Sequence, residues 1–256
     1  MAEQRLRVAL VQHASGLDPE DNRALLDRLT PDDVDLVVLP EAFARDFGEA
    51  GSDVSAYAEP TDGPFTSEVA RVADARGTTV LAGMFETSGD PGRPWNTLVL
   101  RGAATSDYRK VHLYDSFGYR ESDRLSAGEI SAATVQLGGL TLGLMTCYDL
   151  RFPEQARALV DAGADVLVVP SAWVAGQRKV DHWRTLVRAR AIENTTYVVA
   201  VGQPGPRYSG HSMVVDPLGD VLVEAGEGAE TLIATLDREV VERARQTNPS
   251  LANRRR

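Results

Sequence analysis

Short apolar segments alternate with amphipathic ones along the whole sequence, and this alternation limits the folds that the chain can adopt. Residues 6–12 and 36–39 are continuous apolar runs, which is typical of strands buried on both faces. Residues 19–29, between these runs, have the residue pattern of a helix. Because strands buried on both faces need other layers to cover them, the pattern predicts an α/β protein.

The remaining elements favour a mixed sheet topology. Glycine pairs and Asp-Pro turns, at residues 138–139 and 216–219, predict hairpins between neighbouring strands. A four-layer α-β-β-α sandwich, with helices outside two stacked mixed sheets, would use every element, and their even spread favours a single domain over residues 1–256. Further strands are expected at residues 79–85, 97–100, 104–111, 134–137, 141–146, 165–169, 197–201, 211–215, 221–225 and 231–236, and further helices at residues 65–76, 153–162, 180–193 and 238–245.

The composition excludes several kinds of site. Cys147 is the only cysteine, so the chain has no disulfide framework, no cysteine-rich zinc site and no CxxC redox pair. The four histidines are scattered, and no two of them have the i,i+4 spacing of a helical metal site. We therefore expect neither a metal nor an organic cofactor.

Charge and hydropathy define the expected partners and compartment. A net charge of −10 argues against a nucleic-acid partner, and it means that an anionic substrate would need local arginine or lysine to bind. The first apolar run is too short for a signal peptide, and no stretch approaches the length of a membrane span. We expect a soluble cytoplasmic protein, whose thiol stays reduced.

Cys147 lies at a position suited to a nucleophile. An apolar, strand-like run over residues 141–145 precedes it, and a helix is expected to begin near Pro153, because proline is favoured at the first helical position. The thiol would then stand on a sharp strand-to-helix turn, as the serine does in hydrolase elbows. The alternative is that Cys147 is an unreactive, buried apolar residue.

A cysteine nucleophile needs a base, because a free thiol with a pKa of about 8.5 is mostly protonated at pH 7. No histidine stands out beside an Asn or Asp that could orient it, which disfavours a histidine-paired cysteine protease. Glu41 and Lys110 each follow a strand-like run, where α/β enzymes place functional groups. A partly desolvated Glu41 could act as the general base, and Lys110 could stabilise an oxyanion. Each could instead be an ordinary solvated loop charge.

Glu41, Lys110 and Cys147, in this order, resemble the Glu-Lys-Cys triad of the nitrilase superfamily, the carbon–nitrogen hydrolases. Residues 108–115 resemble the lysine motif of that family, and residues 147–154 resemble its nucleophile elbow. The resemblance covers nearly the whole chain and implies an α-β-β-α sandwich that forms homodimers or higher homo-oligomers. It also implies a second glutamate, matched by Glu121, which would orient Lys110 or the substrate amide. Other family-like runs are residues 170–173, 182–183, 188–194 and 210–217.

The residues after the cysteine resemble one branch of that superfamily. True nitrilases usually carry tryptophan next to the cysteine, but this chain has Tyr148. Residues 148–153 resemble the amidases that act on ω-amides of dicarboxylates and on deaminated glutathione. One departure is Gly202, which stands before Gln203 where that branch often has asparagine.

Substrates of that branch carry carboxylates, so their pocket needs a cation besides the catalytic lysine. Arg151 and Arg120 are the candidates, since a guanidinium binds a carboxylate through two hydrogen bonds. Arg151 could instead form a structural ion pair. Tyr148, Trp173 and Phe117 are candidate pocket walls, although the last two could also belong to the core.

The sequence therefore predicts an enzyme that hydrolyses a small-molecule amide to an acid and ammonia through a thioester on Cys147. Hydrolysis of an N-carbamoyl amide or a nitrile by the same triad is an alternative. An alternative from another class is a catalytically silent binding module. The last residues, 248–256, are expected to pack near a subunit interface rather than to form a loose basic tail.

Overall fold

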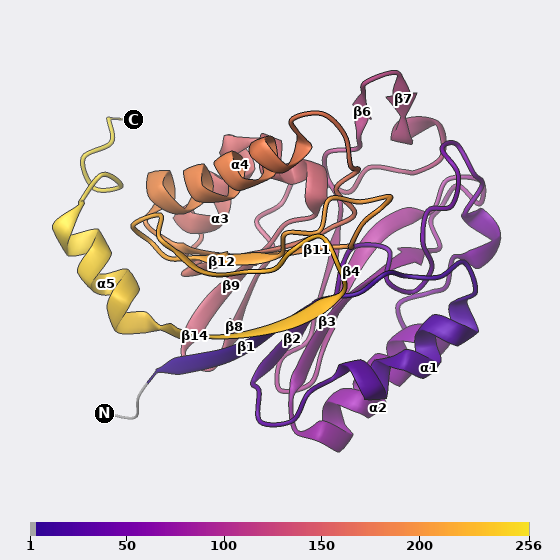
Figure 1. Cartoon of the computed structure of the whole chain (residues 1–256), viewed down its shortest axis with the longest axis horizontal. Helices are drawn as coiled ribbons and strands as arrows, with labels where there is room; N and C mark the ends of the chain where they lie inside the picture. The colour runs from indigo at the N-terminus through magenta and orange to yellow at the C-terminus, as the bar shows by residue number, and fades with distance from the viewer. Residues whose placement is uncertain (1–3, 256) are drawn as a thin grey trace.

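The computed structural model describes residues 4–255, which form two six-stranded sheets stacked face to face. A pair of helices covers the outer face of each sheet (Figure 1). The order of strands is β14-β1-β2-β3-β4-β5 in the first sheet and β13-β12-β11-β10-β9-β8 in the second. The predicted four-layer sandwich with mixed sheets is confirmed.

The first sheet combines a parallel centre with antiparallel edges. Strands β1, β2 and β3 are parallel, while β14 pairs antiparallel with β1 and β4 pairs antiparallel with β3. Gly77 ends α2 in the left-handed conformation with a φ of 62°, which glycine adopts without strain. The elements are β1 (Arg5–Gln12), β2 (Leu36–Val38), β3 (Thr79–Glu86), β4 (Trp95–Arg101), β5 (Ser106–Arg109) and β14 (Glu230–Asp237), with α1 (Pro19–Leu29) and α2 (Pro64–Arg76) on the outer face.

The second sheet has the same mixed character. The β8–β9 hairpin turns at Gly138 and Gly139, whose φ angles of 56° and 82° are those that a two-residue hairpin requires. The elements are β8 (Thr134–Leu137), β9 (Leu140–Leu144), β10 (Val166–Ser171), β11 (Tyr197–Gly202), β12 (Met213–Val215) and β13 (Val221–Glu224), with α3 (Pro153–Asp161) and α4 (Lys179–Asn194) outside and α5 (Arg238–Thr247) after β14.

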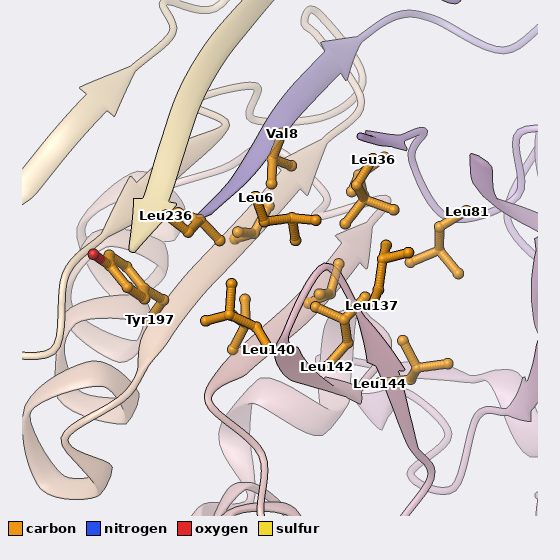
Figure 2. Close-up of a cluster of buried hydrophobic side chains, with 14 of the residues drawn as sticks. Leu6, Val8, Leu36, Leu81, Leu137, Leu140, Leu142, Leu144, Tyr197 and Leu236 are labelled. Atoms are coloured by element: carbon orange, nitrogen blue, oxygen red, sulfur yellow. The ribbon is translucent and has the colours of Figure 1, made fainter. Parts of the chain in front are cut away.

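Three apolar layers separate the four layers of secondary structure. Along β1, Val8 and Leu10 point between the sheets, whereas Ala9 and Val11 point toward α1 and α2. Figure 2 shows the central layer, where leucines and valines of the first sheet contact those of β8 and β9. Both faces of the inner strands are thus covered, which explains their continuous apolar runs.

Some boundaries differ from those predicted from the sequence. The strand expected over residues 211–215 begins only at Met213, because His211 has a left-handed φ of 55°. The strand expected over residues 104–111 is limited to β5. The sequence did not indicate the small hairpin of β6 (Asp115–Ser116) and β7 (Tyr119–Arg120), or the 3₁₀ helices η1 (Ser55–Tyr57), η2 (Glu121–Asp123) and η3 (Cys147–Arg151).

The C-terminal segment packs against the second sheet and its helices. Leu251 contacts the apolar layer between the second sheet and helices α3 and α4, and Arg254 forms an ion pair with Asp161, with Nη1 3.1 Å from Oδ2. Among residues 4–255, no helix is both long and apolar enough to cross a lipid bilayer.

Candidate active site

Three charged or nucleophilic side chains meet where strands of both sheets end. Glu41 follows β2, Lys110 follows β5 directly, and Cys147 follows β9. Strands β2 and β5 run in the same direction in the first sheet, so the residues after them lie at the same edge. All three side chains are buried, with residue exposures of 1% for Glu41, 2% for Lys110 and 7% for Cys147.

The ammonium of Lys110 joins two carboxylates. Its Nζ donates to Oε1 of Glu41 at 2.9 Å and to both carboxylate oxygens of Glu121, at 3.0 and 2.9 Å. Burial alone would lower the pKa of Lys110, but Glu121 and Glu41 hold that pKa well above its usual range. Lys110 therefore stays positively charged at neutral pH.

Glu41 is held at both of its carboxylate oxygens. Asn96 on β4 donates from Nδ2 to Oε1 at 2.7 Å, and the backbone N–H of Ala172, after β10, donates to Oε2 at 2.7 Å. The amide of Gln203 donates to the backbone carbonyl of Glu41 at 3.0 Å. The glutamate thus has a fixed orientation set by both sheets.

Gly202 stands where the resembled amidases often have asparagine, and the structure gives a local reason for the glycine. A Cβ at Gly202 would lie 2.7 Å from the carbonyl oxygen of Gly210, so the backbone of residues 209–211 occupies the space of a side chain. Gln203 is 1% exposed and spans from the Glu41 carbonyl to the N–H of Ser15. Both residues support the glutamate loop from behind and lie outside the lining of the cavity described below.

Glu121 is fully buried beside the lysine. Its Oε2 accepts a hydrogen bond from the backbone N–H of Tyr114 at 2.6 Å in addition to those from Lys110. Burial raises the pKa of Glu121, while the Lys110 charge acts against that rise. The placement fits the predicted role of orienting Lys110.

Cys147 lies on the strand-to-helix turn that the sequence predicts. It opens the 3₁₀ turn η3 between β9 and α3, and its φ of 45° is left-handed, which is uncommon and strained for a residue other than glycine. The Glu41 carboxylate is close enough to the thiol to influence its pKa. Burial, and then the Glu41 charge, raise the pKa of Cys147 well above its usual range, while Lys110 opposes this. The thiol is therefore protonated at neutral pH and needs a base to react.

A cavity of about 560 Å³ opens over these side chains. The predicted site residues that line it are Glu41, Lys110, Phe117, Glu121, Cys147, Tyr148, Arg151 and Trp173. Arg120 lies outside it: its side chain is 69% exposed, and its Nε is 3.5 Å from Asp123. Because side chains alternate along a strand, Tyr119 faces the cavity and its neighbour Arg120 faces away. Arg120 thus lies apart from the cavity that the other predicted site residues line.

Arg151 is the unusual cation of this cavity. Its Nε and Nη2 are buried, and no hydrogen-bond acceptor lies near either atom within residues 4–255. Its guanidinium is 4.8 Å from the centre of the Trp173 ring and 6.0 Å from that of Tyr148. Neither nitrogen forms the structural ion pair considered for Arg151, although the residue lines the cavity.

Two of the three candidate pocket walls, Trp173 and Phe117, differ in position. Trp173 is buried, and its indole N–H donates to the carbonyl of Lys179 at 3.0 Å. Phe117 is 71% exposed on the β6–β7 hairpin and has a φ of 54°, so it lies at the rim of the cavity rather than in the core.

Two further cations line the cavity that the sequence did not indicate. Lys179 donates to the Tyr114 hydroxyl at 3.0 Å and lies 4.3 Å from the centre of the Phe117 ring. Arg207 pairs with Asp46 at 3.2 Å. Lys179 is the first residue of α4, and Arg207 lies in the loop between β11 and β12. Both are outside any recognisable motif, so only their position in the fold reveals them. Within residues 4–255, no three or more His, Cys, Asp or Glu side chains are grouped so that they could hold a metal ion.

The sequence model of the family described as carbon-nitrogen hydrolase matches residues 7–246. The chain belongs to the carbon-nitrogen hydrolase family.

Individual proteins of known name are also similar to this carbon-nitrogen hydrolase. It is 40% identical to the deaminated glutathione amidase of Escherichia coli O157:H7, over 91% of this chain and 89% of that protein. It is 36% identical to the omega-amidase NIT3 of Saccharomyces cerevisiae, over 98% and 94% of the two chains. Its structure resembles that of Saccharomyces cerevisiae Nit3, a member of branch 10 of the nitrilase superfamily, with a TM-score of 0.83, 31% identity and coverage of 99% and 97%. The chain is thus an amidase-type carbon–nitrogen hydrolase of the nitrilase superfamily.

Proposed function

We propose that this hydrolase converts the primary amide of a small, carboxylate-bearing molecule to an acid and ammonia through a thioester on Cys147. The observation that supports the substrate class is Arg151, which lines the cavity and whose buried Nε and Nη2 have no hydrogen-bond partner among residues 4–255. A buried cation without a partner is costly, and a substrate carboxylate would supply the missing hydrogen bonds. The two amidases named above are relatives of the kind that this proposal requires.

The proposed reaction begins with Glu41 as the base. Glu41 takes the proton of Cys147, and the thiolate attacks the amide carbonyl carbon. Lys110 and a backbone N–H, that of Tyr148, stabilise the oxyanion of the tetrahedral intermediate. Glu41 then gives its proton to the leaving nitrogen, so that ammonia departs and a thioester remains.

The second half of the reaction uses the same groups. Glu41 removes a proton from a water molecule, which attacks the thioester carbonyl. The C–S bond breaks, the acid is released, and the proton returns to the sulfur. Glu121 touches neither reacting atom in this scheme, and its two contacts hold the Lys110 ammonium in place.

A substrate panel tests the proposed function. Primary amides with and without a carboxylate, N-carbamoyl compounds and nitriles would be assayed for ammonia, with Cys147→Ala as the blank. We expect ammonia from carboxylate-bearing amides with the wild-type enzyme and none with the variant. Carbon dioxide released together with ammonia would indicate carbamoyl hydrolysis, and ammonia from nitriles would indicate a nitrilase. Ammonia from none of the compounds would indicate a silent binding module.

Replacing Arg151 tests the substrate carboxylate. In Arg151→Met, KM for a carboxylate-bearing amide should rise by about 10- to 10²-fold, because a hydrogen bond to a charged group contributes about 1.5–3 kcal/mol. KM for a neutral amide should change little. Arg120→Met is the matched control, since Arg120 is exposed and outside the cavity. Equal losses with both amides, or equal losses in both variants, would count against a carboxylate site at Arg151.

We also propose that the enzyme forms homodimers. Exposed apolar side chains lie together where the end of α4 meets the β12–β13 turn: Ile192 is 43% exposed, Leu218 is 54% exposed, and Ile192 contacts the turn at Gly219. Sedimentation equilibrium of the full chain should give twice the mass of one chain, whereas the mass of a single chain would contradict the dimer.

A further inference from the structure

Asp149 is a fully buried carboxylate beside the site that takes no part in the proposed reaction. It has four hydrogen-bonding contacts. Its Oδ2 accepts from the Tyr108 hydroxyl at 2.6 Å and from the backbone N–H of Thr146 at 2.9 Å. Its Oδ1 accepts from the backbone N–H of His112 at 3.0 Å and lies 2.8 Å from Nδ1 of the same histidine. These contacts give both carboxylate oxygens the hydrogen-bond partners that a buried polar group needs.

These contacts come from residues next to Lys110 and Cys147, and the reaction depends on the distance between those two side chains. Tyr108 and His112 lie two residues before and two residues after Lys110. Thr146 directly precedes Cys147, and Asp149 itself lies two residues after the cysteine. A single carboxylate thus joins the lysine segment of the first sheet to the nucleophile turn of the second.

No strand pairing supplies such a connection here. Within residues 4–255, β5 pairs only with β4 and forms the edge of the first sheet, while β9 pairs with β8 and β10 in the second. Lys110 and Cys147 therefore stand on separate sheets that meet through side chains. The strained φ of Cys147 persists only if its surroundings hold the turn in place.

Both side-chain partners of Asp149 are themselves fixed by the segment after the turn. Gln155 on α3 donates to the Tyr108 hydroxyl at 2.8 Å. The His112 ring stacks on Phe152, with 3.7 Å between the ring centres and 9° between the planes. Tyr108 and His112 therefore have one orientation each, and a shift of the nucleophile turn would have to break several contacts together.

We propose that Asp149, through Tyr108 and His112, is a positioning residue that sets the separation of Lys110 and Cys147. The inference rests on the proposed function, because it assumes that the Lys110 ammonium acts on a reaction at the Cys147 sulfur. Asp149 touches neither the substrate nor the reacting atoms in this proposal. Its effect on catalysis comes from the geometry that it imposes on the two residues that do.

The test removes the partners of Asp149 and leaves Asp149 itself in place. Tyr108→Phe removes one hydroxyl. His112→Ala removes the ring, and His112→Asn is the conservative variant, because the asparagine Nδ2 can replace the histidine Nδ1 as a donor. Tyr197→Phe is the matched control, since Tyr197 is buried in the same apolar layer between the sheets and its hydroxyl accepts only a long contact of 3.4 Å from Asp237.

We expect a loss in kcat with little change in KM. In Tyr108→Phe and His112→Ala, kcat should fall by about 10- to 10²-fold, because misplacement by about 1 Å can cost 10²-fold in rate. His112→Asn should keep most of the activity, and Tyr197→Phe should match the wild type. The double variant Tyr108→Phe/His112→Ala should lose less than the product of the two single losses, because both partners act through one carboxylate.

Two results would overturn the proposal. One is wild-type kcat in both Tyr108→Phe and His112→Ala. The other is a loss of kcat that follows the loss of thermal stability in every variant, Tyr197→Phe included, with no rescue by His112→Asn. The second pattern would mean that the contacts only stabilise the fold.

A readout without substrate separates failure of this proposal from failure of the proposed function. Cys147 is the only cysteine, so iodoacetamide labels one site in the unmodified full chain. If positioning by Asp149 keeps Lys110 near the sulfur, Tyr108→Phe and His112→Ala should be alkylated at least about threefold more slowly than the wild type and Tyr197→Phe, because a nearby cation favours the thiolate. A wild type without amidase activity that still shows this difference would contradict the proposed function alone. Equal alkylation rates would overturn the positioning role.

Discussion

Glu41 shows how a single residue can meet two opposite requirements. Its charge lies beside the thiol and raises the pKa of Cys147, which keeps the nucleophile protonated at rest. The same carboxylate is placed to take that proton when a substrate is present. Its three hydrogen bonds, from Lys110, Asn96 and Ala172, leave it little freedom to turn away.

Replacing Glu41 by glutamine should separate these two effects. Glu41→Gln removes a negative charge beside the sulfur, so the pKa of Cys147 should fall and the midpoint of iodoacetamide labelling should move to lower pH. Ammonia release should nevertheless fall by about 10²- to 10⁴-fold, because the general base is lost. Labelling rates between pH 6 and 10, beside amidase assays, provide the measurement, with the exposed Glu129→Gln as control. A midpoint that stays or moves upward would contradict the role of the Glu41 charge.

At the scale of elements, the position of the glutamate depends on β3. Gly83 lies buried near the middle of that strand, and the loop after β2 runs directly over it. A Cβ at Gly83 would be 2.5 Å from the Ala42 nitrogen and 2.9 Å from the Glu41 Cα, and the Gly83 carbonyl accepts from Ala44 at 2.9 Å. The absent side chain lets the glutamate loop use β3 as its support.

A methyl group at Gly83 should therefore displace the base. In Gly83→Ala, the free energy of unfolding should fall by about 1–3 kcal/mol, the usual cost of overpacking a core, and kcat should fall by more than tenfold. Gly89→Ala is the control, since Gly89 is exposed and has open space around its Cα. Urea unfolding and steady-state kinetics on both variants test this. Wild-type kcat in Gly83→Ala would show that the loop adapts without cost.

The whole molecule is held together by its three apolar layers, and the central one is remote from the chemistry. Leu142 on β9 is fully buried between the two sheets and contacts neither the cavity nor its supporting hydrogen bonds (Figure 2). The layers of this sandwich therefore contribute stability, while the loops at the strand ends contribute reactivity.

Leu142→Ala should separate stability from activity. The free energy of unfolding should fall by about 2–5 kcal/mol, because a buried leucine loses its contacts and leaves a cavity. At a temperature where the variant is folded, kcat and KM should match the wild type. Ile130→Ala, at a side chain that is 90% exposed, should change neither property. A kcat that falls together with stability would mean that the site depends on the central layer.

Much of this architecture could be predicted from the sequence, because its signals are local. Continuous apolar runs identify strands covered on both faces, and glycines such as Gly77 identify the ends of elements. The strand before Cys147 and the turn at Cys147 were predicted from neighbouring residues in the same way, and the structure has both. Glu41 and Lys110 were predicted as site residues because each follows a strand-like run, and the structure places their side chains in contact.

The rest could not be predicted, because it depends on contacts between distant segments. Nothing in the sequence distinguishes Arg151, which faces the cavity, from Arg120, which faces away, because the direction of a side chain in a two-residue strand has no periodic signal. Lys179, at the start of α4, and Arg207, in the loop between β11 and β12, reach the cavity only because distant segments fold together. The contacts of Asp149 span 37 and 41 residues to His112 and Tyr108, beyond the reach of any local pattern.

The pairing of β1 with β14 has a consequence for how the protein is made. The register runs from Arg5 opposite Asp237 to Gln12 opposite Glu230. Strand β1 is synthesised long before β14 and stays unpaired on this side until β14 emerges. The strands of the second sheet, from β8 to β13, are consecutive in the chain and can assemble as they emerge. Until β14 is synthesised, an apolar strand keeps one edge open, and such an edge can pair with another chain. The nascent polypeptide is therefore vulnerable to aggregation at this edge from the synthesis of β1 until that of β14.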